Sequence, residues 1–253
     1  MDGLLVGRLD PPSITLQNLS VQYGHKTIIH ALSGEFKPGS LTAIVGPNGG
    51  GKSTLLKAIL KLIPNVTGEI KFQHAIPQEV AYLAQQNLID RQFPLTVSDT
   101  VALGLFRKLG LFARVSEDDK KAIQNALVRV GLEGYENSPL EALSGGQFQR
   151  VLFARLILQN SPIIFLDEPF NAIDMRTIED LMDIVNEWRQ EGRLIVVVLH
   201  DIDLVRDFFP ETLLLARNLI GWGKTEDILT QDRLIEAMHT SRTWDGEGIH
   251  HHG

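Results

Sequence analysis

The segment GPNGGGKST, which begins at Gly46, constrains the fold of this chain more than any other feature. It fits the pattern G-x-x-x-x-G-K-[ST] of a phosphate-binding loop. Glycines allow backbone N–H groups to converge on phosphate oxygens, and a following helix adds the positive end of its dipole. The apolar run LTAIV at 41–45 predicts a buried parallel strand before the loop, and a helix is expected over about 52–63. Strand, loop and helix together predict an α/β fold and make a plain glycine-rich turn the weaker interpretation.

The fixed positions of this pattern have defined roles. The lysine meets the β- and γ-phosphates of a nucleotide, and the hydroxyl of the next residue binds Mg²⁺. We therefore expect Lys52 and Ser53 in these roles. The predicted nucleotide-binding residues of the loop are Gly46, Pro47, Asn48, Gly49, Gly50, Gly51, Lys52, Ser53 and Thr54.

An acidic pair follows a second apolar run. Asp167 ends the run IIFLD, and Glu168 comes directly after it. A carboxylate at the end of such a strand faces the phosphate loop across the sheet edge, so Asp167 would hold Mg²⁺ through water. Glu168 is the candidate that polarises an attacking water. An ordinary acidic loop is the alternative, and the two motifs together would also fit a kinase, a GTPase or a RecA-like motor.

Residues 143–147 read LSGGQ and distinguish between these classes. The segment comes directly before a predicted helix, so a hydroxyl, backbone N–H groups and a helix dipole would point at one anion. As an isolated motif it could equally be a helix-capping turn, and the two roles are compatible. The residues of the motif are Leu143, Ser144, Gly145, Gly146 and Gln147, followed shortly by Gln149 and Arg150.

In this order, the phosphate loop, LSGGQ and the acidic pair resemble the nucleotide-binding subunit of an ATP-binding cassette (ABC) transporter, over about residues 14–235. The resemblance implies ATP and Mg²⁺ as cofactors and ATP hydrolysis as the activity. It also implies that two cassettes face each other, with LSGGQ binding the γ-phosphate of the ATP on the other subunit. The family more often has alanine or serine where Gly50 stands, and serine or glycine where Asn171 stands.

Single residues complete the family set. Gln85 matches the glutamine that links Mg²⁺ and the attacking water to the transmembrane partner, although Gln86 could be confused with it. His200 matches the switch histidine that contacts the γ-phosphate, and Tyr23 matches the aromatic residue that stacks on adenine. Asp174 matches the loop that crosses the dimer interface. Without the other motifs, His200 and Tyr23 would more often be structural.

The expected fold class is α/β, with a P-loop NTPase (RecA-like) core of parallel strands, an N-terminal antiparallel β region and an inserted α-helical subdomain. Ser116 and Asp119 predict a capping box at the start of one helix. Strands are expected near 14–23, 27–37, 68–72, 80–84, 162–166, 194–199 and 212–216, and a helix over 175–190. The predicted parallel core covers about 41–85 and 160–220. The chain is expected to be a single ABC ATPase domain over 1–253, with the β region and core at 14–85 and 160–235, the helical subdomain at 86–159 and a tail at 236–253.

Composition narrows the function classes. The net charge of −7 and the pI near 5.6 give no general attraction to nucleic acid. The chain has no cysteine, which excludes disulfides and thiolate metal sites. No secretory signal is expected, and no apolar run approaches the ~20 residues that cross a bilayer. We expect a peripheral protein on the cytoplasmic face of the inner (plasma) membrane, with other chains crossing the bilayer.

Transport is favoured over a soluble ABC ATPase that acts on DNA or ribosomes. Repair ATPases insert a long coiled coil for which the segment between Gln85 and Ser144 has no room, and translation factors carry two tandem cassettes. The stretches QQNLIDRQFPLTVSDTVALG and LDEPFNAID resemble the importers of zinc and manganese; iron-chelate importers are the second candidate. The resemblance implies an integral membrane permease, which would contact residues 86–107, and indirectly a solute-binding protein. The cassette would form a homodimer or pair with another cassette, and bind no nucleic acid.

The tail contains three adjacent histidines, His250, His251 and His252. Adjacent imidazoles can bind Zn²⁺. A disordered terminus or the remnant of an expression tag is the alternative. The sequence leaves both interpretations open.

Overall fold

The computed structural model describes residues 10–85, 91–106 and 115–246, without side chains from 241 onward. The chain divides into two compact units. The first, here the core unit, contains residues up to Val80, residues 162–165 and everything from Trp188 onward. The second, here the helical unit, contains residues 81–161 and 166–187.

The core unit contains a three-stranded antiparallel sheet in the order β2-β1-β4. Its strands are β1 (Ser13–Tyr23), β2 (Lys26–Phe36) and β4 (Val66–Gln73). Ile14, Leu16, Leu19 and Val21 of β1 are buried. The hairpin of β1 and β2 is confirmed. The prediction that the strand at 68–72 belongs to the parallel core is wrong, because β4 pairs antiparallel with β1. Its alternating exposure is the pattern of a strand with one solvated face.

The core unit also contains most of a second sheet, in which the strands lie in the order β6-β7-β3-β8-β9. These strands are β3 (Leu41–Val45), β6 (Ile163–Asp167, which ends in the helical unit), β7 (Leu194–Val198), β8 (Glu211–Ala216) and β9 (Asn218–Lys224). β3 pairs in parallel with β7 and β8, and all three are short apolar runs, as expected of strands covered on both faces. β9 was not predicted. It pairs antiparallel with β8, and its glycine-containing sequence NLIGWGK gives little strand signal.

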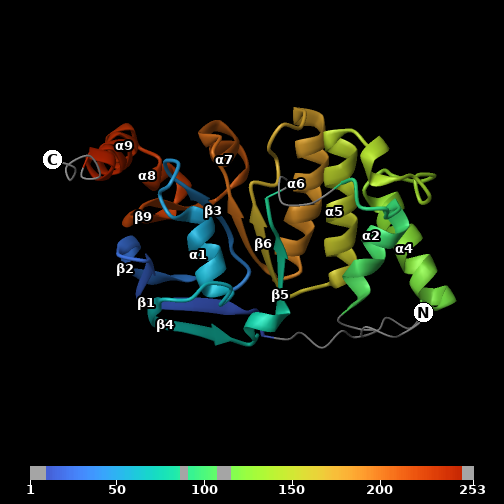
Figure 1. Ribbon diagram of the computed structural model, residues 1–253, viewed down its shortest axis with the longest axis horizontal. Helices are drawn as coiled ribbons and strands as arrows, with labels where there is room; N and C mark the ends of the chain where they lie inside the picture. Colours follow the sequence, from blue (N-terminus) through green and yellow to red (C-terminus); the bar gives the residue numbers. More distant parts are fainter. Residues whose placement is uncertain (1–9, 86–90, 107–114, 247–253) are drawn as a thin grey trace. The chain divides into compact units, whose positions relative to one another are not determined.

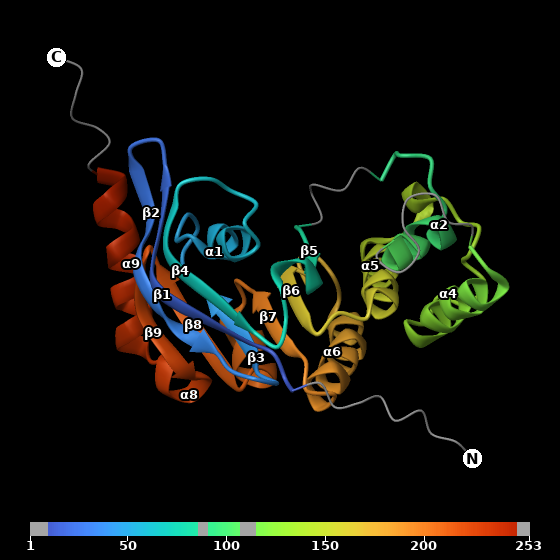
Figure 2. The same ribbon diagram turned by 90° about the horizontal axis from the view of Figure 1, so that it is seen from below.

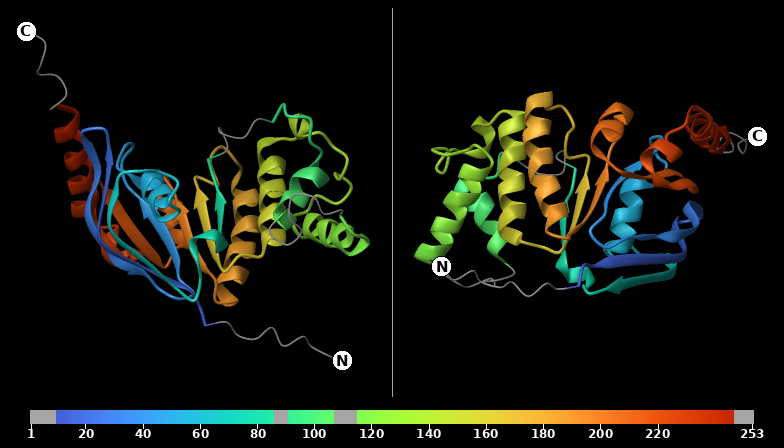
Figure 3. Two further views of the ribbon diagram at one scale, coloured as in Figure 1. Left: turned by 60° about the horizontal axis from the view of Figure 1, so that its bottom comes forward. Right: turned by 180° about the vertical axis from the view of Figure 1, so that it is seen from behind.

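Helices flank these sheets. In Figure 1, α1 lies against the three-stranded sheet, and Figure 3 shows α9 beside β8 and β9. The helices are α1 (Lys52–Ile59), α7 (Ile202–Phe208), α8 (Thr225–Ile228) and α9 (Gln231–Gly246). The helix predicted over 52–63 ends earlier, because Lys61 adopts a left-handed backbone conformation, with φ 58°, and Pro64 follows.

The helical unit is built around the buried helix α5, which contacts α2 and α4 (Figure 2). Its elements are β5 (Val80–Leu83, beside β6), α2 (Val97–Ala102), α4 (Glu117–Arg129), α5 (Gly145–Gln159) and α6 (Met175–Gln190, whose last residues belong to the core unit). The capping box of Ser116 and Asp119 is confirmed at the start of α4. The α/β class with a parallel core, N-terminal antiparallel strands and helices is confirmed.

Candidate nucleotide site

The phosphate loop lies between β3 and α1 in the core unit. Lys52, the first residue of α1, is 5% exposed, and its Nζ donates to the carbonyl oxygens of Gly46 at 2.9 Å and Pro47 at 3.0 Å. The ammonium group is therefore held over the loop. Gly46 has φ 147° and Gly51 has φ 96°, conformations that side chains rarely adopt. The loop thus needs glycine at these positions for its backbone conformation.

The turn between β8 and β9 supports this loop. The backbone N–H of Arg217 donates to the carbonyl oxygen of Gly50 at 2.8 Å. A Cβ added at Gly46 would lie 1.9 Å from the carbonyl oxygen of Leu215. At Gly50, a Cβ would lie 2.8 Å from the same oxygen and 2.9 Å from that of Pro47. The close approach of Leu215 accounts for both glycines. Sequence reasoning missed this support because the turn lies far along the chain.

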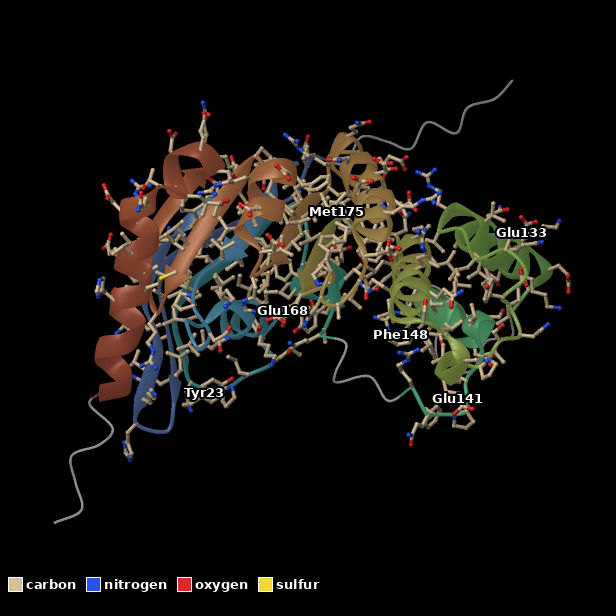
Figure 4. The ribbon with its side chains drawn as sticks, turned by 90° about the horizontal axis from the view of Figure 1, so that it is seen from above. Tyr23, Glu133, Glu141, Phe148, Glu168 and Met175 are labelled. Atoms are coloured by element: carbon tan, nitrogen blue, oxygen red, sulfur yellow. The ribbon has the colours of Figure 1, made fainter. Side chains whose placement is uncertain are left out.

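Two predicted contacts of the nucleotide also belong to the core unit. Tyr23 ends β1 and is 45% exposed, so its ring is accessible for stacking (Figure 4). His200 follows β7, and the N–H of Leu199 donates to the carbonyl oxygen of Ile44 on β3 at 3.1 Å. Because parallel strands end at one sheet edge, His200 and the loop after β3 leave the sheet at the same edge.

The acidic pair belongs to the helical unit. Side chains of β5 and of the residues directly after it donate hydrogen bonds to both carboxylates. The hydroxyl of Tyr82 donates to Oδ2 of Asp167 at 3.1 Å, and Nε2 of Gln85 donates to Oε2 of Glu168 at 2.6 Å. Asp167 is 3% exposed. Glu168, labelled in Figure 4, has φ 52°, a strained conformation for a residue with a side chain. Such strain is typical of functional sites. Gln86 lies outside the described residues.

Tyr82 was not predicted as a site residue. Burial first, and then the charge of Asp167 and the hydrogen bond to it, raise the pKa of the Tyr82 hydroxyl above its ordinary value. The phenol therefore stays protonated and remains a donor to Asp167. The only signal in the sequence is its position in VAYLAQQ, shortly before Gln85. Because successive side chains of a strand point to opposite faces, Tyr82 faces the side opposite to that of its two neighbours.

The LSGGQ segment begins α5 in the helical unit. Ser144 is the N-cap residue: its Oγ accepts from the N–H of Gln147 at 3.2 Å, and Oε1 of Gln147 accepts from the N–H of Ser144 at 2.9 Å. Nε2 of Gln147 donates to the hydroxyl of Tyr135 at 3.0 Å. The capping role of the motif is thus present, and Ser144 itself stays exposed.

Asp174 lies next to this segment, within the same unit. A Cβ added at Gly146 would lie 3.6 Å from Oδ2 of Asp174 and 3.3 Å from Oγ1 of Thr177. The backbone N–H and the hydroxyl of Thr177 donate to the Asp174 carboxylate, and these hydrogen bonds lower its pKa. Asp174 therefore caps the start of α6 while its loop adjoins LSGGQ.

The described residues contain no group of three or more His, Cys, Asp or Glu side chains that could hold a metal ion. His250, His251 and His252, for which a metal site and an inert tail were both considered, lie outside the described part of the chain. Between residues 10 and 246, leaving out the two undescribed gaps, no helix is long and apolar enough to span a membrane.

Known proteins resemble this chain over most of its length. The family model "ABC transporter" matches residues 29–171. The manganese transport system ATP-binding protein MntB of Halalkalibacterium halodurans is 39% identical to it, over 89% of this chain and 92% of that protein. A metal-chelate type ABC transporter in an inward-facing conformation has a TM-score of 0.79 at 27% identity, over 90% of this chain and 89% of that one. The dimeric bacterial ABC transporter cassette MJ0796 has a TM-score of 0.72 at 29% identity, over 84% and 98%. With the family model matching more than half of its residues, this chain belongs to the ABC transporter family.

Proposed function

We propose that this chain is the ATP-hydrolysing subunit of an ABC importer whose cargo is a divalent metal ion, manganese or zinc. ATP binding and hydrolysis are characteristic of the family to which the chain belongs. The proposed cargo is supported by the likeness, at 36–39% identity over most of the chain, to manganese transport ATP-binding proteins from several bacteria. The cassette does not contact the cargo, so this part of the proposal rests on likeness alone.

In the core unit, the ATP phosphates would bind in the loop from Gly46 to Thr54. Lys52 would exchange its two carbonyl contacts for the β- and γ-phosphates, which carry more negative charge than a carbonyl oxygen. Tyr23 would stack on the adenine, and His200 would contact the γ-phosphate. The hydrogen bond from the backbone N–H of Arg217 helps to hold the loop in this conformation.

Mg²⁺ would be held by Ser53, Gln85 and Asp167, the last through water. A hydroxyl, an amide and a carboxylate are hard oxygen donors, which suit this ion. The buried Asp167 accepts from Tyr82 through Oδ2, so one face of its carboxylate is oriented by the protein. The ion, when bound, would neutralise charge on the phosphates; this chain supplies the ligands and their orientation.

Glu168 would accept a proton from the attacking water. Its Oε2 accepts the hydrogen bond from Nε2 of Gln85, which orients the carboxylate. A Mg²⁺ ion would bind the amide oxygen of Gln85, so Nε2 of the same side chain can keep donating to Glu168. Gln85 would thereby connect the Mg²⁺ site to the carboxylate of Glu168.

The functional state would be a two-fold pair of cassettes, with ATP between Lys52 of one chain and Ser144 of the other. The dimeric cassette at 29% identity supports this arrangement. Partners would be integral membrane permease subunits and, through them, a solute-binding protein, with the cassette on the cytoplasmic face of the membrane. A second, different cassette could replace the second copy.

A cellular experiment tests the cargo. Deleting this gene should cause a growth defect in metal-depleted medium that added Mn²⁺ or Zn²⁺ rescues, and the native gene but not its Lys52→Ala variant should complement it. The iron-chelate importer is the second candidate, favoured by the likeness to a metal-chelate type transporter. Rescue by a ferric chelate alone would support the iron-chelate importer. The absence of any metal phenotype would contradict both this candidate and the manganese or zinc importer.

A further inference from the structure

Arg91 contacts both ends of the LSGGQ segment in the helical unit. Its Nη2 donates to the carbonyl oxygen of Leu140 at 3.3 Å and also to that of Leu143, the first residue of the motif. Its guanidinium carbon lies 4.8 Å from the centre of the ring of Phe148, the residue directly after the motif. Figure 4 shows Phe148 on α5, with α2 beside it. One side chain thus bridges the whole signature segment.

These contacts are partly shielded from water, because Arg91 is half-buried. The ring of Phe148 is fully buried, and Leu140 and Leu143 are buried as well. A guanidinium can donate in a plane and stack on an aromatic face at the same time, which an ammonium cannot do. Both interactions gain strength when water is excluded. The contact therefore requires arginine rather than any cation.

The peptide between Leu143 and Ser144 is fixed from both of its sides. Arg91 holds its carbonyl oxygen, and Oε1 of Gln147 accepts from its N–H at 2.9 Å. Because a peptide unit is planar, these two contacts set its orientation. That orientation determines where the Ser144 hydroxyl and the first N–H groups of α5 point.

We propose that Arg91 is a positioning residue for the signature segment, which holds the Leu143–Ser144 peptide so that Ser144 and the start of α5 face the ATP of a partner cassette. The inference rests on the proposed function of LSGGQ across the dimer. Arg91 is not part of the phosphate loop, the LSGGQ segment or the acidic pair. It lies shortly after Gln85 and before α2, in the segment expected to contact the permease, so it also joins that segment to the signature.

The test uses Arg91→Met, which removes the donors, and Arg91→Lys, which keeps the charge but loses the planar fork. Both are made in the Glu168→Gln background, where hydrolysis is blocked. Arg129→Met is the matched control, because Arg129 pairs with the exposed Glu187 of α6 rather than with a residue of the signature segment. ATP affinity of the dilute monomer and ATP-driven dimerisation are measured separately.

Arg91→Met should leave the monomer's ATP affinity unchanged within about twofold and raise the ATP-dependent dimer dissociation constant about tenfold or more. Arg91→Lys should raise it about threefold, and Arg129→Met should not change it. If Arg91→Met does not fold, Arg91→Lys carries the test. Equal dimerisation of the Glu168→Gln parent and its Arg91 variants would overturn the role of Arg91 alone. A parent that fails to dimerise with ATP would overturn the proposed function, and the role of Arg91 with it.

A double-mutant cycle separates positioning from general stability. Arg91 and Gln147 act on the same peptide, so the effects of Arg91→Met and Gln147→Ala on the dimer dissociation constant should be non-additive. Arg129→Met and Gln147→Ala should be additive. Additive effects for Arg91 and Gln147 would show that they do not act through the shared peptide, and would overturn the proposed mechanism.

Discussion

The phosphate loop of the core unit and the signature segment of the helical unit both present backbone N–H groups at the start of a helix, but different forces hold them. Backbone geometry fixes the phosphate loop: Gly46 and Gly51 have positive φ, and Arg217 donates its N–H to Gly50. Side chains fix the signature segment, through Arg91 and Gln147. The first region should therefore be sensitive to an added Cβ atom, and the second to the loss of donors.

The largest effect is expected for Glu168→Gln, which should separate ATP hydrolysis from ATP binding. Glu168→Gln keeps the size of the side chain and its contact with Gln85 but removes the carboxylate that accepts the proton. ATP hydrolysis should fall by about 10²- to 10⁴-fold. ATP binding by the core unit should persist, as measured by equilibrium titration with ATP. Hydrolysis at the native rate would contradict the role of Glu168.

Gly46→Ala tests the backbone-held loop. The new Cβ would overlap the carbonyl oxygen of Leu215, 1.9 Å away, in a conformation that alanine rarely adopts. The dissociation constant of ATP should rise about 100-fold, as a strain of a few kcal/mol would produce. Gly49→Ala is the control: it has a positive φ of 72° but nothing within 4 Å of its Cβ, so the rise should be only about a few-fold. Equal effects of both substitutions would show that the contact with Leu215 does not matter.

Ser144→Ala tests the side-chain-held segment. It removes the N-cap hydroxyl and the donor proposed for the partner's γ-phosphate. We expect a loss of about tenfold in kcat, the effect of one hydrogen bond to a charged group. The ATP affinity of the dilute monomer should not change, because the partner's ATP is bound elsewhere. A loss of monomer affinity would instead place Ser144 in the site of its own chain.

The smallest effect is expected for Tyr82→Phe. Loss of the hydrogen bond to Asp167 should raise the Mg²⁺ concentration for half-maximal hydrolysis about threefold. The pH dependence has a defined sign. Because the folded pKa of Tyr82 is raised above the unfolded value of 10.0, its contribution to stability is complete below pH 10 and is lost as the pH rises toward the folded pKa. Tyr82→Phe should therefore lose less stability above pH 10 than the native chain, as measured by denaturant unfolding. An identical decline would contradict this assignment.

Local patterns predicted much of the fold. The runs LTAIV, IIFLD and LIVVV gave buried strands, and the spacing of Ser116 and Asp119 gave the capping box of α4. These features depend on neighbouring residues. The pairing of β4 with β1 depends on a distant partner, and β9 pairs with the adjacent β8 but has a glycine-containing sequence with little strand signal; neither was predicted.

The same distinction applies to the candidate site. Glycine patterns and strand-end carboxylates can be read from the sequence because their geometry is local. The roles of Leu215, Arg217, Tyr82 and Arg91 could not, since each acts on a residue far away in the chain. Their hydrogen bonds join Gly50 to Arg217, Tyr82 to Asp167 and Arg91 to Leu143. Supporting contacts therefore need the structure, while the motifs they support do not.

The most direct test of the central claim, an ATP-hydrolysing cassette with a site shared between two chains, is the oligomeric state of the Glu168→Gln variant. Size-exclusion chromatography with multi-angle light scattering would measure its mass with Mg²⁺-ATP, with Mg²⁺-ADP and without nucleotide. We expect twice the monomer mass with ATP alone, and the monomer of 28.2 kDa in the other two conditions. A variant that binds ATP yet remains a monomer at all protein concentrations would contradict the shared site.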